Sequence, residues 1–312
     1  MSSQTIITEQ LASSRPHDGV HVSSTLFDYW ALTKPEVNFL ILITTSVGFY
    51  LGLGRGAGPF SFAALFNTLF GTLLVASGTG TLNQYIEREF DAQMRRTARR
   101  PLAAGRLKPA TVLVFGVALA AAGGIYLAAA VNPLTSLLAA LTLLSYLFVY
   151  TPLKRKTPLC VLAGAFPGAM PPLIGWAAAS GGLNGGAWTL YAILFFWQFP
   201  HFMAIAWMYR EDYDRAGYLM LPKGNARVPV VILQTLLPLL VLVAVSVMQS
   251  PARYATVFHW AATLLGAGFL YFGLKFLIQR SGTAARRLLT ASIVYLPLLC
   301  ALSATLCNPV RW

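Results

Sequence analysis

Residues 71–91 read GTLLVASGTGTLNQYIEREFD, an apolar run that ends in a patch of three carboxylates, Glu87, Glu89 and Asp91. The run belongs to an apolar stretch of about 20 residues, which is the length that an α-helix needs to cross a hydrocarbon core of ~30 Å. Because lipid offers no hydrogen-bond partner to backbone N–H and C=O groups, such a stretch must be helical. The segment therefore predicts a transmembrane helix that ends in acidic side chains.

Similar stretches recur along the chain, which has 312 residues and is 56% hydrophobic and only 11% charged. We expect an all-α polytopic membrane protein with nine transmembrane helices in a single bundle, formed by residues 28–306. Residues 1–27 are polar and are expected to form a disordered cytoplasmic tail, and residues 307–312 a short outer tail. The expected spans are 37–55, 62–82, 110–130, 132–150, 158–178, 187–208, 228–248, 256–278 and 288–306.

The net charge of +13 follows the expected topology and does not form one nucleic-acid-binding patch. Of the 23 Lys and Arg residues, all but Arg55, Arg253 and Arg311 lie on one side of the spans, in tails, in loops or near the end of a span. Because cytoplasmic loops are enriched in Lys and Arg, this asymmetry predicts an inside N-terminus and an outside C-terminus. We therefore expect a protein of the plasma (inner) membrane, surrounded by the lipid bilayer, with no nucleic-acid partner.

A second acidic patch, Glu211, Asp212 and Asp214, follows the sixth span, so both patches are expected on the cytoplasmic face. In the first patch Asn83, Glu87 and Asp91 recur at i, i+4 and i+8 and share one helix face. Carboxylate and amide oxygens near a membrane edge suit Mg²⁺, which is often bound by few carboxylates together with substrate phosphates. The alternative is a solvated helix end with ordinary i,i+4 ion pairs.

Basic side chains adjoin both patches and a third inside loop, residues 150–155. Guanidinium groups beside a carboxylate-bound metal provide what a diphosphate needs, because they bind the oxygens that the metal leaves free. Three such loops over an apolar bundle indicate a lipid diphosphate site, where the C–O bond can ionise if the leaving group is stabilised. Nearby aromatic side chains could line a dry cavity for the resulting cation, or they could form ordinary interfacial belts. The basic residues are Arg95, Arg96, Arg99, Arg100, Lys154, Arg155 and Arg210.

Two spans contain residues that a simple anchor would lack. Pro167, Pro171 and Pro172 should break the fifth span, because proline removes a helical hydrogen bond. The sixth span ends with Gln198 and His201 at membrane depth, where polar groups usually mark function. Broken helices and inward polar groups also suit a secondary transporter, but the acids lie at the membrane edge and not at its midplane.

Taken together, these motifs resemble the UbiA superfamily of intramembrane prenyltransferases, over residues 28–306. The matching residues are Thr33-Lys34-Pro35, Asn83-Gln84 with Glu87 and Asp91, Met94-Arg95-Arg96-Thr97 with Arg99-Arg100-Pro101-Leu102, Tyr150-Thr151-Pro152-Leu153-Lys154-Arg155, Gly164-Ala165 with Pro171-Pro172, Gly175-Trp176, Trp197-Gln198 with Pro200-His201-Phe202, and Arg210-Glu211-Asp212-Tyr213.

The resemblance is closest to the branch that farnesylates heme b, and it implies Mg²⁺-dependent transfer of farnesyl from farnesyl diphosphate to a vinyl group of heme b. It leaves other acceptors open, such as an aromatic acid or a chlorophyllide, and suggests heme-handling or oxidase-assembly proteins as partners. One departure is that Ala216 stands four residues after Asp212, where the superfamily often has a second acid, so the number of metal ions and the role of Asp214 stay open. The roles implied are metal binding by Asn83, Glu87, Asp91 and Asp212, catalysis by Asp91, Asp212 and Tyr150, diphosphate binding by Arg95, Arg96, Arg99, Arg100, Lys154, Arg155 and Arg210, and heme binding by His201.

Overall fold

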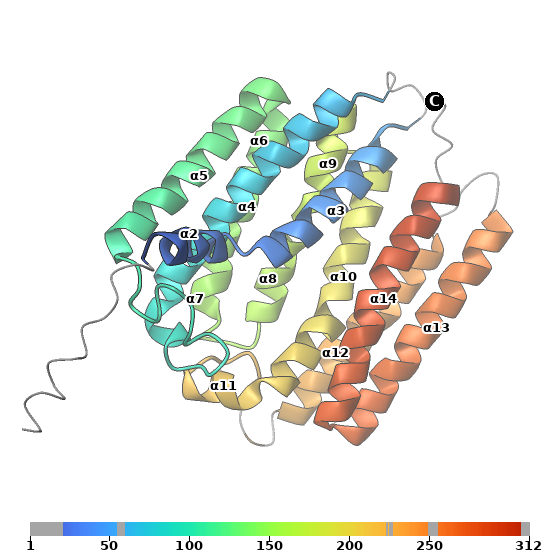
Figure 1. Ribbon diagram of the computed structural model, residues 1–312. Helices are drawn as coiled ribbons and strands as arrows, with labels where there is room; N and C mark the ends of the chain where they lie inside the picture. The colour runs from blue at the N-terminus through green and yellow to red at the C-terminus, as the bar shows by residue number, and fades with distance from the viewer. Residues whose placement is uncertain (1–20, 55–59, 223, 225–226, 249–254, 307–312) are drawn as a thin grey trace, which may run out of the picture.

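The computed structural model describes residues 21–54, 60–222, 224, 227–248 and 255–306, and every regular element in these ranges is helical. Long helices run side by side in one bundle, with short helices and loops gathered at one end (Figure 1). The elements are α2 (His21–Leu32), α3 (Pro35–Gly52), α4 (Phe62–Asp91), α5 (Pro109–Ala130), α6 (Pro133–Leu144), the π-helical turn η1 (Ser145–Tyr150), α7 (Thr151–Leu153), α8 (Cys160–Gly168), α9 (Met170–Ser180), α10 (Gly185–Met208), α11 (Arg210–Arg215), α12 (Arg227–Met248), α13 (Ala255–Gln279) and α14 (Gly282–Leu306).

Eight helical segments are long and apolar enough to cross a membrane, and they coincide with the second to ninth spans expected from the sequence. The all-α membrane fold is therefore confirmed. Helix α3 lies over the first expected span, but it is not among the eight, because polar residues such as Glu36 and Asn38 lower the hydropathy of its 18 residues. The count of nine spans and the orientation of the termini stay predictions.

The fifth span is broken where its prolines predict a break. Helix α8 ends at Gly168 and α9 begins at Met170, with Pro171 and Pro172 in the first turn of α9. Proline is favoured in a first helical turn because its missing N–H would have no intrahelical partner there. The side chain of Gln198 on α10 donates to the carbonyl of Ala165 at 3.1 Å, so a polar group at membrane depth is satisfied inside the protein.

Glycines allow several helices to approach backbone to backbone. A Cβ atom at Gly175 on α9 would lie 1.9 Å from the carbonyl oxygen of Thr45 on α3, and one at Gly48 on α3 would lie 2.1 Å from that of Pro172. On the other side of the bundle, a Cβ at Gly123 of α5 would lie 2.7 Å from the backbone nitrogen of Val75 on α4. Since helices gain no hydrophobic energy from each other in lipid, such close packing is a main source of their association.

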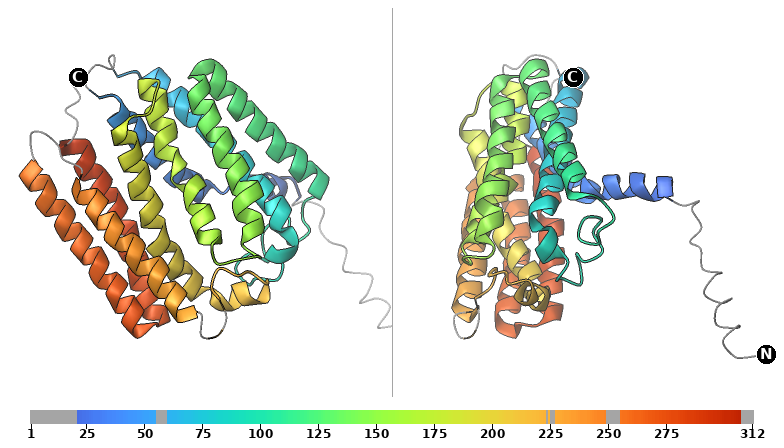
Figure 2. Two further views of the ribbon diagram at one scale, coloured as in Figure 1. Left: turned by 180° about the vertical axis from the view of Figure 1, so that it is seen from behind. Right: turned by 90° about the vertical axis from the view of Figure 1, so that its left-hand side faces the viewer.

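Helix α2 begins at His21, inside the range expected to be a disordered tail; residues 1–20 lie outside the described part of the chain. Unlike the long helices, α2 extends outward from the bundle, crosswise to its neighbours (Figure 2). It leads through Lys34 into α3, close to the end of the bundle where α4 ends, α7 and α11 lie, and residues 92–108 form a loop (Figure 1). We call this the cavity end, because it contains the cavity that is described in the next section.

Candidate active site

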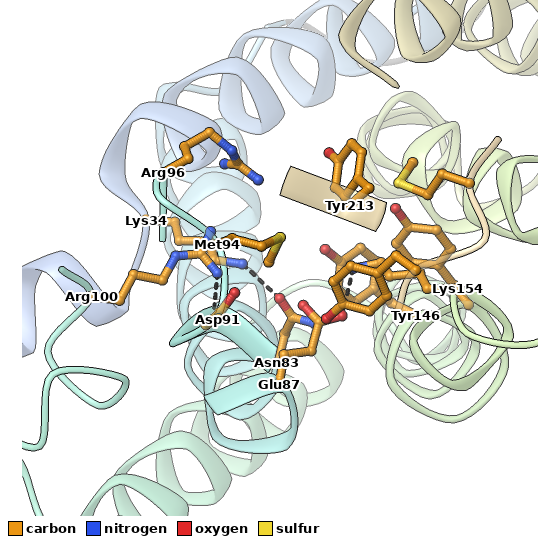
Figure 3. Close-up of a pocket in the computed structure, with 13 residues that line it drawn as sticks. Lys34, Asn83, Glu87, Asp91, Met94, Arg96, Arg100, Tyr146, Lys154 and Tyr213 are labelled. Carbon is orange, nitrogen blue, oxygen red and sulfur yellow. Dashed lines mark hydrogen bonds and ion pairs between the residues drawn. The ribbon is translucent and has the colours of Figure 1, made fainter. Parts of the chain in front are cut away.

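The last turns of α4 present a stripe of oxygen-bearing side chains to a cavity of about 170 Å³ at the cavity end (Figure 3). Asn83, Glu87 and Asp91 are 1%, 5% and 1% exposed, so they are not a solvated helix end. Their spacing places them on one face, as the sequence predicts. The cavity is lined by Lys34, Asn83, Glu87, Asp91, Met94, Arg96, Arg100, Tyr146, Tyr150, Lys154, Tyr213, Tyr218 and Met220.

Each member of the stripe is paired with a cation from a different part of the chain. Lys154 Nζ lies 2.8 Å from Glu87 Oε1, and Arg100 Nη1 lies 2.7 Å from Asp91 Oδ2. Lys34 Nζ donates to Asn83 Oδ1 at 2.8 Å. The three cations come from the α2–α3 junction, the loop of residues 92–108 and the residue after α7. Tertiary folding, and not local sequence, therefore assembles the charged cavity.

Lys34 lines the cavity, although its place in the Thr33-Lys34-Pro35 motif did not indicate a role there. It caps α3 in the left-handed conformation, with φ 54° and ψ 61°, and Pro35 follows it in the first helical turn. Burial, followed by repulsion from the Arg100 guanidinium, lowers the pKa of Lys34 to about 7. The sequence Lys34-Pro35 between two expected helical segments indicated an unusual backbone conformation. It did not indicate the direction of the Lys34 side chain.

Lys154 remains charged in spite of its burial. Burial works to lower its pKa, but Tyr150 and the Glu87 carboxylate outweigh that effect, and the pKa lies well above its usual range. Its ammonium also lies 4.5 Å from the centre of the Tyr150 ring and 5.9 Å from that of Tyr218. This lysine thus combines an ion pair with cation–π contacts, which are strongest where water is excluded.

Four tyrosines form much of the remaining wall. Tyr146 and Tyr150 come from η1, a π-helical turn of the kind that often occurs at functional sites. Tyr213 ends up on α11 and Tyr218 follows it, and burial raises the pKa of both phenols, so they stay protonated at neutral pH. Sequence reasoning missed Tyr213 and Tyr218 as wall residues, because only the fold brings α11 and the residues after it to the same cavity as η1.

The second acidic patch adjoins the cavity but does not line it. Asp212 accepts a hydrogen bond from the backbone nitrogen of Arg96 at 3.4 Å and forms an ion pair with Arg215. The side chain of Arg96 does line the cavity, and its guanidinium lies 5.4 Å from the centre of the Tyr209 ring. The contact between Asp212 and Arg96 therefore joins the second patch to the loop that helps to line the cavity.

The structure places the other expected site residues outside the cavity wall. Arg95 and Arg99 are exposed on the loop of residues 92–108. The guanidinium of Arg155 lies 4.1 Å from the centre of the Phe90 ring, and Arg210 donates to the carbonyl of Trp207 at 3.1 Å. The set brought together at the cavity is Asn83, Glu87, Asp91, Arg96, Arg100, Tyr150 and Lys154.

His201 lies on α10, away from the cavity. Its Nδ1 is 2.8 Å from Ser292 Oγ on α14, and its ring stacks on that of Trp197 with centroids 4.6 Å apart. The indole of Trp197 donates to the carbonyl of Ser292 at 2.8 Å. The histidine is thus held in one orientation by two helices, which fixes the direction of its second ring nitrogen.

The cavity offers oxygen donors of the kind that Mg²⁺ prefers. In the described part of the chain, no group of three or more His, Cys, Asp and Glu side chains is arranged as a ready metal cage. However, Asp91 Oδ1 is buried without a hydrogen-bond partner among the described residues, although its other oxygen is paired with Arg100. Because Mg²⁺ usually takes one or two carboxylates, with water and phosphate oxygens as its other ligands, a complete protein cage is not needed. The donor set therefore fits Mg²⁺ bound together with a phosphate ligand.

Comparison with known proteins identifies the relatives of this chain. The model of the UbiA prenyltransferase family matches residues 41–296. The chain is 46% identical to the protoheme IX farnesyltransferase of Solibacter usitatus, over 87% of this chain and 96% of that protein. It is 41% identical to the protoheme IX farnesyltransferase of Koribacter versatilis, over 95% of this chain and 96% of that protein.

Among solved structures, the chain is similar to a UbiA homologue from Archaeoglobus fulgidus bound to GPP and Mg²⁺. The TM-score is 0.64 at 16% identity, and the match covers 88% of this chain and 99% of that one. This likeness confirms the fold that the sequence motifs indicated.

Proposed function

The chain belongs to the UbiA prenyltransferase family, and we propose that it transfers a farnesyl group from farnesyl diphosphate to a vinyl group of heme b, giving heme O and diphosphate. The observation that carries the proposal is the cavity at one end of an apolar bundle, where four basic side chains meet a stripe of buried oxygen donors (Figure 3). The relatives that support farnesyl as donor group and heme b as acceptor are named protoheme IX farnesyltransferase and match nearly the whole chain.

The diphosphate lies among the cavity cations. Lys34, Arg100 and Lys154 each donate to an oxygen atom of the α4 stripe, and a phosphate oxygen is an equivalent acceptor. Binding of the diphosphate exchanges these partners, so that the cations turn to phosphate oxygens and the carboxylates are released. Arg96 closes the wall from the loop, while Arg95, Arg99, Arg155 and Arg210 lie outside it and attract the anionic ligand to the cavity.

The released oxygens would hold Mg²⁺. Asn83, Glu87 and Asp91 supply donors from the cavity wall, and the buried, unpartnered Oδ1 of Asp91 is already free to do so. Asp212 would join them from the rim if it released Arg215. When bound, the metal neutralises the charge that grows on the leaving diphosphate.

The chain's own residues promote ionisation of the donor. The C–O bond breaks with its electron pair on the diphosphate, where Lys34, Arg100 and Lys154 offset the new charge. The aromatic faces of Tyr146 and Tyr150 stabilise the allylic cation and keep water from it. The vinyl π electrons of the acceptor then form the new C–C bond. Water discharges the cation left beside the porphyrin and releases a proton.

His201 is our candidate for contact with heme. Because Nδ1 is held by Ser292, the other ring nitrogen is the one that can ligate iron. Replacement by alanine, His201→Ala, should weaken heme binding at least tenfold without changing the affinity for farnesyl diphosphate. If heme affinity and turnover are normal, His201 is a structural residue only.

Catalysis takes place on the cytoplasmic side of the plasma (inner) membrane, where the basic loops lie by the positive-inside rule. Heme-handling or oxidase-assembly proteins would supply the acceptor or receive the product.

The test is to incubate the purified chain in lipid nanodiscs with heme b, farnesyl diphosphate and Mg²⁺, and to analyse the pigments by mass spectrometry. We expect a farnesylated heme that disappears with EDTA and with Asp91→Asn. Glu89→Gln is a matched control, because this acid lies on the same helix with its side chain 72% exposed, and the product should persist. Consumption of farnesyl diphosphate without modified heme would refute heme b as the acceptor. If both substrates stay unchanged although the protein is folded, the proposed transferase activity is refuted.

A further inference from the structure

Helix α2 exposes an apolar face that nothing in the described part of the chain covers. Leu26, Phe27 and Trp30 are 70%, 68% and 61% exposed. At 100° per residue, Leu26 and Trp30 are 40° apart around the helix, and Phe27 lies within 100° of Leu26. One arc of α2 is therefore made of large apolar side chains.

The opposite arc of α2 is packed against the protein. The guanidinium of Arg106 donates to both carboxylate oxygens of Asp28, with Nε 2.9 Å from Oδ2 and Nη2 2.9 Å from Oδ1. Leu32 is fully buried, with Leu102 and Val112 in the same cluster. The polar group of this helix thus faces the protein, and the apolar groups face outward, which is the reverse of a helix packed on a water-soluble domain.

The arrangement also fixes the direction of the apolar arc. Asp28 meets the loop of residues 92–108, which lies on the side of α2 toward the cavity end (Figure 2, right). Leu26 and Trp30 lie 160–200° from Asp28 around the helix, by the same 100° step. They therefore point away from the loop and back along α4 and α5, toward the depth at which those spans meet lipid.

We propose that α2 is an interfacial helix, lying in the bilayer leaflet at the cavity end with Leu26, Phe27 and Trp30 among the acyl chains. Tryptophan is typical of this depth, and amphipathic helices bind there through an apolar face. Exposed cations follow in the loop of residues 92–108 that α2 contacts, namely Arg99 and Lys108. The lipid-facing side chains continue into α3, where Val37, Phe39 and Leu40 are exposed. Both features favour an anionic bilayer over a second copy of the chain.

The helix connects this surface to the cavity. Gln84 on α4 donates to the carbonyl of Leu32 at 3.0 Å, beside Asn83 of the stripe. Lys34 follows two residues later and reaches Asn83 in the cavity. The loop held by Asp28 carries Arg96 and Arg100. Lipid contact of α2 thus sets the positions of cations at both sides of the cavity.

The test uses nitroxide labels on the full chain in nanodiscs of phosphatidylcholine and phosphatidylglycerol. Labels are attached to Leu26→Cys and Trp30→Cys, and to Ala104→Cys, an exposed position on the loop, as the matched control. Cys160 and Cys300 are buried and can stay, while Cys307 is replaced by serine. Collision rates with O₂, which concentrates in lipid, and with a water-soluble nickel chelate are measured by electron paramagnetic resonance.

We expect O₂ to relax the labels at 26 and 30 several-fold more than the nickel chelate does, and the reverse at 104. Dominant nickel collisions at 26 and 30 would place the apolar arc in water and overturn the proposal. Low collision rates with both reagents, together with dipolar broadening between labels, would place a second copy of the chain there and overturn it as well.

Discussion

The buried ion pair between Lys154 and Glu87 offers a way to separate the stability of the site from its chemistry. The two side chains are 11% and 6% exposed, and Nζ lies 2.8 Å from Oε1. At an effective dielectric constant of ~20, unit charges at this distance attract by about 6 kcal/mol, before the cost of their burial. Because removal of one partner leaves the other charge buried and unpaired, such a change typically costs roughly 3–5 kcal/mol.

We therefore expect Glu87→Gln and Lys154→Met each to lower the free energy of unfolding by roughly 3–5 kcal/mol. The double variant removes both charges and should recover most of that loss. Transfer activity should behave differently, because the double variant has lost the cation that we propose binds phosphate and one of the proposed metal ligands. We expect its kcat/KM to stay at least ~10²-fold below that of the unchanged chain, as for the loss of one electrostatic donor in other active sites.

The free energy of unfolding can be measured by reversible denaturant titration in mixed micelles, with kcat/KM measured on the same preparations. Arg88 and Glu89 provide the control, because they form an ion pair of similar length, 3.0 Å, with side chains 34% and 72% exposed. Removal of Arg88 should cost at most ~1 kcal/mol. If the effects of the two buried changes on stability simply add, the pair is not coupled. If the double variant is active, neither side chain has the role proposed here.

Three further predictions concern packing and the link from α2. Gly123→Ala should destabilise the α4–α5 contact by about 1–3 kcal/mol, since its Cβ would lie 2.7 Å from a backbone nitrogen. The control is Gly124→Ala, whose Cβ would meet no atom within 4 Å, and this change should be neutral or stabilising by ~1 kcal/mol. Both effects can be measured by thermal unfolding. Gly168→Ala should lower heat stability by a similar amount, because its Cβ would lie 1.9 Å from Oε1 of Gln198; an unchanged midpoint would show that this amide can move. Asp28→Asn should raise KM for farnesyl diphosphate more than it lowers kcat, because it weakens the contact of α2 with the loop of residues 92–108 without touching the reacting atoms. An unchanged KM would show that this contact does not affect substrate binding in the cavity.

Local sequence patterns were sufficient for the parts of the fold that depend on local physics. Hydropathy locates the spans because each span must satisfy its own backbone, whatever its neighbours are. The i, i+4, i+8 spacing was sufficient to place Asn83, Glu87 and Asp91 on one face of α4, because the period of an α-helix alone decides which residues share a face. The break between α8 and α9 follows from proline chemistry.

Partner choice within the site could not be read from the chain in this way. Seven arginines and lysines were equally good candidates by sequence, but only Arg96, Arg100 and Lys154 among them line the cavity. Lys34 enters it from a position 49 residues away from Asn83, and that pairing depends on how α2 and α3 meet α4. Helix α2 was missed because its apolar residues are too few for a span, and only the orientation of its faces shows what they do.

The balance of charge in the cavity explains why these particular pairs are stable without a ligand and still suited to bind one. Arg96, Arg100 and Lys154 line the wall as cations, and Lys34 is partly protonated at pH 7, against the two carboxylates Glu87 and Asp91. Because buried charges are costly without partners, the carboxylates hold Lys154 and Arg100 in place, and a net positive charge remains. A complex of Mg²⁺ with a prenyl diphosphate is anionic and compensates that excess.

Replacement of either carboxylate by its amide would therefore increase the positive charge and strengthen binding of a metal-free diphosphate, even as it abolishes transfer. Equilibrium binding of farnesyl diphosphate with EDTA present should be tighter for Asp91→Asn than for the unchanged chain. Weaker binding would mean that Asp91 acts chiefly by orienting Arg100 and that charge balance does not govern the cavity.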